Sequence, residues 1–438
     1  MEILIKALQL ILSLSILVVL HELGHFIPAK LFKTKVEKFY LFFDPWFSLF
    51  KVKKGETEYG IGWLPLGGYV KIAGMIDESM DKDAMKKPAE PWEFRSKPAW
   101  QRLIIMIGGV TVNLILGVLI YAMVLFTWGE QHLAPENAIY GISTDSIGRN
   151  MGFQDGDMIL SVDNKKVKSF GAVTHNILFD KAKTVQVQRA GEKVELYVNE
   201  ETIHDVIAFK SSLISPRIPF YVDSLIPDYP AIASGLKKGD QFIRINEQSA
   251  AYFQDAVKLI RAHKNEEITM EVLRGGDTLQ FSAIVSNLGT LGIKNKGPND
   301  LFKIDSVEYG FFASFPASIN MSVTTVVDYV KQMKLIFTVE DAYQEIGSFA
   351  TIGNAFSSTW NWRTFWNMTG LLSFVLAVMN ILPIPALDGG HVMFLLYEMI
   401  AGRPPQEKVL EYAQYVGMIL LITVMLFAIK NDVVRFLL

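Results

Sequence analysis

The sequence predicts a polytopic α-helical membrane protein with four transmembrane helices, a membrane-associated β-hairpin and two similar small α+β domains in tandem. Three observations predict this fold class. Half of the 438 residues are hydrophobic, four apolar stretches are long enough to cross about 30 Å of hydrocarbon, and one glycine-containing pattern occurs twice. The formal net charge of -3 gives no indication of a nucleic-acid partner. The absence of cysteine excludes disulfides and thiolate metal ligands.

The first two apolar stretches flank a polar loop. The first span, residues 1–32, begins like a secretory signal because Lys6 precedes an apolar core, but no small-residue cleavage site follows. We therefore interpret it as an uncleaved span. Residues 33–102 form the loop, and the second span, residues 103–127, contains no charged residue.

Two further spans follow much later, at residues 367–400 and 409–432. Lysines and arginines flank the loop 33–102 on both sides, whereas residues 127–148 contain neither. The bias of positive residues toward the cytoplasm places this loop inside, and both termini with residues 128–367 outside. Lys430 and Arg435 argue mildly against this orientation.

The outer region contains an internal repeat, which predicts domains at residues 130–212 and 213–295. Gly152–Asp163 aligns with Gly235–Asn246: each has a Gly-Asp pair followed by alternating apolar positions, and each precedes an alternating strand. The pattern resembles the PDZ domains of bacterial membrane and periplasmic proteases, which implies peptide binding at a sheet edge. A pair of β-rich spacer domains is the alternative.

Two more segments have a readable pattern. Tyr59–Gly74 has apolar residues alternating with glycines, a turn rich in proline and glycine, and a returning strand, which predicts the β-hairpin. Within residues 296–366, apolar residues recur at helical spacing between Val323 and Phe337. We expect an amphipathic helix there, at the membrane surface or against the outer domains.

The sequence HELGH ends the first span. His21 and His25 share one face of a helix one turn apart and can bind one zinc ion, while Glu22 lies beside the metal. In a soluble protein this spacing is often accidental. Inside a span each ionisable group costs about 2.5–3.5 kcal/mol and is usually retained for function. A structural metal site or a histidine pair of a transporter remains an alternative.

A catalytic zinc generally has three protein ligands and one open position. Asp388 is the candidate for the third, because the prolines and glycines of Asn380–Gly390 must interrupt the third span near it. An interrupted backbone at membrane depth faces protein or a watery cavity, so Asp388 can reach the first span. A helix cap at the membrane boundary is the simpler interpretation of Asp388 taken alone. His391 is a less favoured ligand candidate.

Together these motifs resemble the bacterial site-2 proteases of the regulator of sigma-E protease type, and the likeness covers nearly the whole chain. The motifs are HELGH, the cytoplasmic hairpin, the tandem PDZ-like domains and N-x-x-P-x-P-x-x-D-G-G. The resemblance implies one zinc ion per chain, bound by His21, His25 and Asp388, with Glu22 as the catalytic base. It also implies that the outer domains act as a gate against substrates with bulky external parts.

The family places further residues near the substrate. Asn380 matches an asparagine close to the substrate backbone, and Asn113 matches the asparagine of a Gly-Pro-x-x-Asn motif in which this chain has Val110 instead of proline. An unwound substrate could add a strand to the hairpin edge. The expected substrate-binding residues are Asn380, Asn113, Gly67, Gly68 and Tyr69.

The resulting functional hypothesis is an intramembrane zinc metalloendopeptidase in the bacterial inner membrane. Its partners would be the lipid bilayer and single-span substrates already cut by another protease, either anti-sigma factors or remnant signal peptides. Two other classes compete with it. A membrane scaffold that tethers peptides needs no zinc ligands. A metal transporter needs a polar path across all four spans, and the sequence supplies only one polar cluster for such a path.

Overall fold

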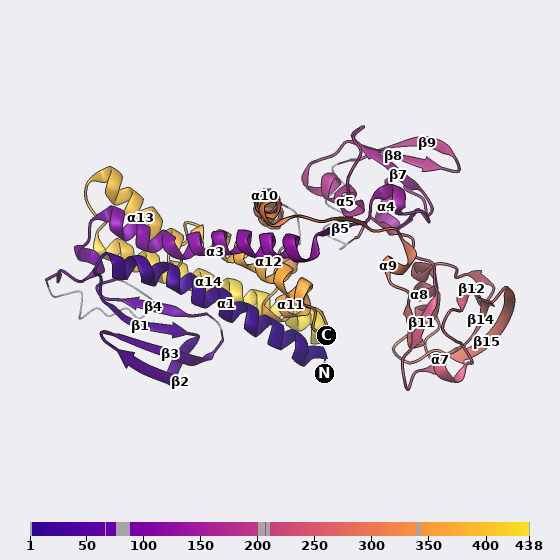
Figure 1. Ribbon diagram of the computed structural model, residues 1–438, viewed down its shortest axis with the longest axis horizontal. Helices are drawn as coiled ribbons and strands as arrows, with labels where there is room; N and C mark the ends of the chain where they lie inside the picture. The colour runs from indigo at the N-terminus through magenta and orange to yellow at the C-terminus, as the bar shows by residue number, and fades with distance from the viewer. Residues whose placement is uncertain are drawn as a thin grey trace. The chain divides into compact units, whose positions relative to one another are not determined.

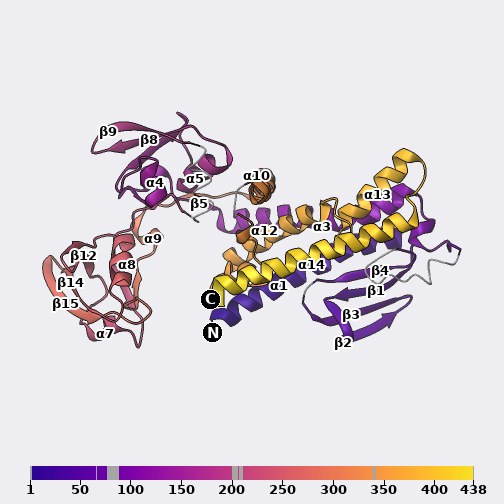
Figure 2. The ribbon, with the colours of Figure 1, turned by 180° about the vertical axis from the view of Figure 1, so that it is seen from behind.

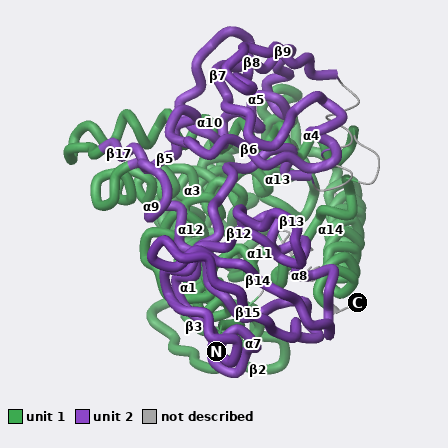
Figure 3. Tube along the Cα trace, turned by 90° about the vertical axis from the view of Figure 1, so that its right-hand side faces the viewer, with its two compact units in different colours: residues 1–129, 308–438 green, residues 130–307 purple. Residues whose placement is uncertain are grey.

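The computed structural model describes residues 2–65, 67–75, 88–199, 206, 211–338 and 342–437. The chain divides into two compact units (Figure 3). One unit combines residues 1–129 with residues 308–438, and the other comprises residues 130–307. The first contains the long apolar helices, and the second is an α+β unit.

The described residues include four helices that are long and apolar enough to cross a membrane, as the sequence predicts. They are α1 (Glu2–Leu31), α3 (Ala99–Trp128), α12 (Trp362–Ile381) and α14 (Glu407–Leu437). Helix α3 packs against both α1 and α12. The two chain termini lie at the same end of this unit (Figures 1 and 2). The chain is therefore built as a multi-pass membrane protein.

The predicted third span, 367–400, consists of two helices, as its prolines and glycines require. Helix α12 ends at Ile381, and α13 begins at Asp388 and ends at Ala401. The connecting backbone folds back closely on α13: a Cβ atom on Gly390 would lie 2.6 Å from the carbonyl oxygen of Ile384. The interruption therefore places Asp388 at the first turn of a helix.

The loop after α1 forms a four-stranded sheet. Its strands are β1 (Val36–Leu41), β2 (Phe43–Lys54), β3 (Thr57–Leu64) and β4 (Tyr69–Ile72), in the spatial order β2-β3-β1-β4. The predicted Tyr59–Gly74 hairpin is wrong, because β1 lies between β3 and β4 and pairs with both. The hairpin of this sheet is instead β2 with β3, and β4 is an edge strand.

Glycines of β3 explain why β1 occupies the central position. The side chain of Tyr40 in β1 is completely buried, and its hydroxyl donates to Glu58 at 2.7 Å. A Cβ atom on Gly60 would overlap the Tyr40 ring. The glycines that alternate with apolar residues in β3 thus accommodate a neighbouring strand, whereas the sequence analysis assigned them to a two-stranded hairpin.

The predicted amphipathic segment lies in the longer helix α10 (Phe311–Thr338), which packs against α3 within the same unit. Three buried serines, Ser314, Ser318 and Ser322, recur every fourth residue along it. Small residues at this spacing permit close helix approach. Helix α10 is seen end-on in Figure 1 while α3 runs across the picture, so the two helices cross steeply. The other elements among the described residues of this unit are η1 (Phe94–Ser96), η3 (Ala342–Glu345) and α11 (Phe349–Asn354).

The second unit contains two successive segments whose elements follow the same order, apart from an additional strand, β13, in the second. The first has β6 (Ile142–Thr144), α4 (Ser146–Asn150), β7 (Met158–Val162), α5 (Phe170–Phe179), β8 (Thr184–Arg189), β9 (Glu192–Tyr197) and β10 (Ile214–Pro216). The second has β11 (Val222–Leu225), α7 (Pro230–Ala233), β12 (Gln241–Ile245), β13 (Gln248–Ser249), α8 (Phe253–Ala262), β14 (Glu267–Arg274), β15 (Asp277–Ile284) and β16 (Ile293–Asn295). In each, the first strand pairs with the last.

Both segments also contain the same ion pair. The repeated Gly-Asp aspartates, Asp157 and Asp240, are buried, and each accepts two hydrogen bonds from an arginine, Arg189 or Arg274. Each arginine also donates to the first glycine carbonyl of its repeat. Burial alone would raise the pKa of Asp240, but the hydrogen bonds from Arg274 and from the Lys237 amide outweigh it and hold this pKa below its usual value.

The strand pairs shift the predicted domain boundaries. Strand β10 pairs with β6 and therefore belongs with the first segment, beyond the predicted boundary at residue 212. The unit also includes β5 (Glu130–His132), η2 (Pro135–Asn137), α9 (Pro298–Leu301) and β17 (Asp305–Val307). Strand β17 pairs with β5, Val307 opposite Glu130, so the unit extends past residue 295 and the chain enters and leaves it on adjacent strands.

Candidate metal centre and active site

Helix α1 positions the two histidines. The apolar run keeps this segment helical through HELGH, and the Nε2 atoms of His21 and His25 lie 3.3 Å apart on one face. Beside them α1 crosses α3 at a glycine contact: a Cβ atom on Gly24 or on Gly108 would overlap the carbonyl of the other. Neither glycine is among the predicted site residues, although small residues where two spans cross are a signal that a sequence can show.

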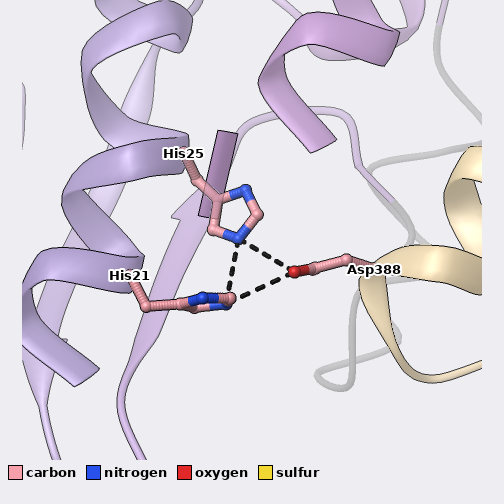
Figure 4. Close-up of side chains that lie close together, drawn as sticks. All are labelled: His21, His25 and Asp388. Atoms are coloured by element: carbon pink, nitrogen blue, oxygen red, sulfur yellow. Dashed lines mark hydrogen bonds and ion pairs between the residues drawn. The ribbon is translucent and has the colours of Figure 1, made fainter. Parts of the chain in front are cut away.

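Asp388 reaches this pair from the first turn of α13 (Figure 4). Its Oδ2 atom lies 3.3 Å from Nε2 of His21 and 3.3 Å from Nε2 of His25. The three side chains are only 12%, 8% and 16% exposed, in the order His21, His25, Asp388. The structure thus brings together the three residues that the sequence analysis expected to meet.

The cluster fits a zinc ion. Three ligand atoms mutually 3.3 Å apart match one face of a tetrahedron with metal–ligand bonds of about 2.0 Å. Oδ2 of Asp388 is buried and, apart from its 3.3 Å contacts with the two Nε2 atoms, has no hydrogen-bond partner, as expected of a metal-binding atom. Within the described part of the chain, no other group of three histidine or carboxylate side chains converges in this way.

His25 is held in the form that binds a metal through Nε2. Its Nδ1 atom lies 2.8 Å from the carbonyl oxygen of Ile105 in α3. A carbonyl oxygen only accepts, so Nδ1 carries a proton, and in the neutral imidazole the lone pair then lies on Nε2. Metal-binding histidines commonly have such a partner. No sequence pattern predicts this contact, because its acceptor is a main-chain carbonyl oxygen.

Glu22 and the edge strand β4 line one cleft together with the three cluster residues. The cleft has a volume of about 610 Å³ and is bordered by Gly68 and by all four residues of β4. The Glu22 side chain is buried, 9% exposed, and a Cβ atom on Gly68 would lie 3.4 Å from its Cγ. His391 also lines this cleft but is not part of the three-residue cluster. A carboxylate, a group of candidate metal ligands and the edge strand of the described sheet therefore line one cleft.

The remaining expected substrate residues are placed differently. Asn380 is partly buried, with Nδ2 3.4 Å from Nε2 of His21, so it borders the cluster. Asn113 is completely buried behind the other side of the His21 ring, with Nδ2 3.2 Å from Nδ1. Neither Gly67, Asn113 nor Asn380 belongs to the residues that line the cleft. Val110 lies inside the unbroken helix α3, so this chain has no turn at that position.

Comparison with known proteins gives the family. The model described as "Peptidase family M50" matches residues 9–424. The chain belongs to this family. As an M50 peptidase it is a zinc-dependent metalloprotease of the site-2 type, and Zn²⁺ is its cofactor.

Its similarity to individual M50 relatives extends over almost the full length. The regulator of sigma-E protease RseP of Escherichia coli is 27% identical over 97% of each chain. A Xylella fastidiosa protein named as a zinc metalloprotease is 30% identical over 97% of each chain. One with the same designation from Neisseria meningitidis is 27% identical over 98% of this chain and 99% of its own.

Proposed function

We propose that this M50 peptidase hydrolyses peptide bonds inside transmembrane segments at a site formed by His21, Glu22, His25 and Asp388. The observation that carries the proposal is the convergence of three metal-ligand atoms, 3.3 Å apart, from two segments of the apolar helical unit. One zinc ion per chain would be held by Nε2 of each histidine and by Oδ2 of Asp388. A buried carboxylate beside such a cluster is the arrangement that hydrolysis requires.

The bound zinc would supply a Lewis acid that polarises the scissile carbonyl and an activated water. Glu22 accepts a proton from that water as its oxygen forms a bond to the carbonyl carbon. The C–N bond then breaks, and Glu22 returns the proton to the leaving amine nitrogen. The products are a carboxylic acid and an amine, which become a carboxylate and an ammonium group when the acid proton passes to the amine, and Glu22 ends in its starting state.

A transmembrane helix must unwind before this attack, because its carbonyls are engaged in backbone hydrogen bonds. Strand β4 can provide backbone hydrogen bonds that replace those lost when the substrate helix unwinds. It is an edge strand, it lines the cleft beside Glu22, and its open side can pair with an extended segment of substrate. Asn380 lies close enough to the cluster to bind a further freed backbone group.

The position of β4 can be tested with Gly68→Ala. A Cβ atom there would lie 2.6 Å from Cγ1 of Val18 and 2.7 Å from the Tyr40 carbonyl oxygen, so the backbone just before β4 must shift away from β1. We expect the KM for a transmembrane substrate to rise several-fold while zinc content stays at one ion per chain. Gly171→Ala, which makes the same change in open space, is the matched control. An unchanged KM in Gly68→Ala would argue against β4 as the substrate edge.

We further propose that the protein resides in the bacterial inner membrane, with residues 33–102 in the cytoplasm and the PDZ-like unit outside. Its substrates would be single-span proteins of the anti-sigma factor type or remnant signal peptides, already trimmed by another protease. The PDZ-like unit would exclude untrimmed substrates by bulk. Support comes from the distribution of lysines and arginines and from the repeated Gly-Asp segments with their shared ion pair.

The gate can be tested by removing the whole unit 130–307. Because Glu130 pairs with Val307, a short Gly-Ser linker can join Gly129 to Glu308 without straining the helical unit. We expect the parent to cleave only a substrate with a short external stub, and the deletion variant to cleave both this substrate and one with a folded external domain. A tether predicts slower cleavage of both. Loss of activity on both substrates, with zinc retained, would count against the gate.

A further inference from the structure

One face of α3 carries three residues directed at the histidine pair. Ile105, Gly109 and Asn113 follow one another at four-residue spacing, which places them in one row on a helix. The carbonyl of Ile105 accepts from His25. A Cβ atom on Gly109 would lie 2.6 Å from Cε1 and 2.8 Å from Nε2 of His21, so the glycine leaves room for the imidazoles. Asn113 is the third member of the row, opposite Nδ1 of His21.

The chemistry of a zinc-bound imidazole fixes what Asn113 must do. If Nε2 of His21 binds the metal, Nδ1 carries a proton and needs an acceptor. The amide nitrogen of Asn113 lies 3.2 Å from Nδ1 and can only donate, an arrangement that suits an imidazole with its proton on Nε2. Meanwhile Oδ1 of Asn113 is buried and has no hydrogen-bond partner. Rotating the amide by half a turn presents this oxygen to Nδ1.

We propose that Asn113 is a positioning residue for the metal, which accepts a hydrogen bond through Oδ1 from Nδ1–H of His21, and that it does not bind substrate. This inference rests on the proposed zinc site. The backbone of Asn113 is held beside His21, because the hydroxyl of Ser373 donates to the Asn113 carbonyl at 2.7 Å. The Asn113 side chain is completely buried. His25 and His21 thus each have their own acceptor on α3: a main-chain carbonyl for one, the Asn113 amide for the other.

The test compares two substitutions of Asn113 by the zinc affinity of the full-length protein, measured by competition with a chelator in detergent. Asn113→Leu keeps the volume but removes the acceptor, and we expect zinc affinity to fall about 10–100-fold. Asn113→Asp restores an acceptor and should recover affinity to within a few-fold of the parent. The matched control is Thr369→Val, which removes another fully buried hydrogen bond, to Ser13, away from the metal. It should retain the parent affinity.

Three other outcomes would overturn the proposal. If Asn113→Leu binds zinc like the parent but has a raised KM, Asn113 contacts substrate. If Asn113→Asp fails to recover zinc affinity, or if Thr369→Val loses as much zinc affinity as Asn113→Leu, Asn113 only packs the helices. A wrong assignment of the zinc site can be told apart from a wrong role for Asn113, because His25→Ala would then also retain zinc.

Discussion

Replacing Glu22 by Gln is expected to lower the rate of transmembrane peptide cleavage by about 10²–10⁴-fold or more, because the glutamine amide cannot accept the proton of the attacking water. Glutamine keeps the size of the side chain, and Glu22 is not one of the three clustered ligands, so zinc should stay bound at one ion per chain. The measurement is single-turnover cleavage of a trimmed single-span substrate in reconstituted liposomes. The uncleaved substrate should remain associated with the variant.

The control for this result is Glu192→Gln, which makes the same change on an exposed strand of the second unit. It should cleave at the parent rate. If Glu22→Gln also cleaved at nearly the parent rate, Glu22 would not be the base, even if the zinc ligands were correctly assigned.

The second large effect concerns metal content. His25→Ala and Asp388→Ala are each expected to lose stoichiometric zinc, because each leaves two protein ligands where a catalytic zinc has three. Zinc per chain is measured by elemental mass spectrometry after loosely bound metal is removed. His263→Ala, which removes a histidine at the end of α8 in the other unit, should retain zinc and serves as control. Full zinc content in both ligand variants would show that the site lies elsewhere.

Local spacing explains why part of the site was predictable. His21 and His25 are one helical turn apart, so their proximity follows once the segment is helical. Asp388 is distant in the chain, but the prolines and glycines around it predict an interrupted span, and an ionisable residue there needs a partner. The four spans are predictable for a similar reason, since each depends on a continuous apolar stretch.

The remainder depends on tertiary contacts that leave little local signal. Strand β1 lies between β3 and β4 because Gly60 admits the ring of Tyr40, a fit that requires the two strands to be already adjacent. The acceptor for His25 is the main-chain carbonyl of Ile105, which any residue type would supply. Asn113 is recognisable as a motif residue, but its burial behind the His21 ring, on which the proposed positioning role rests, leaves no signal in the sequence.

The proposed function depends on one zinc ion bound between His21, His25 and Asp388. Anomalous scattering from crystals of the zinc-loaded protein, recorded on both sides of the zinc absorption edge, would locate this ion. We predict a single strong peak per chain, about 2.0–2.2 Å from Nε2 of each histidine and from Oδ2 of Asp388. A peak at any other group of side chains, or a peak of full height in Asp388→Ala crystals, would show that this zinc site is wrong.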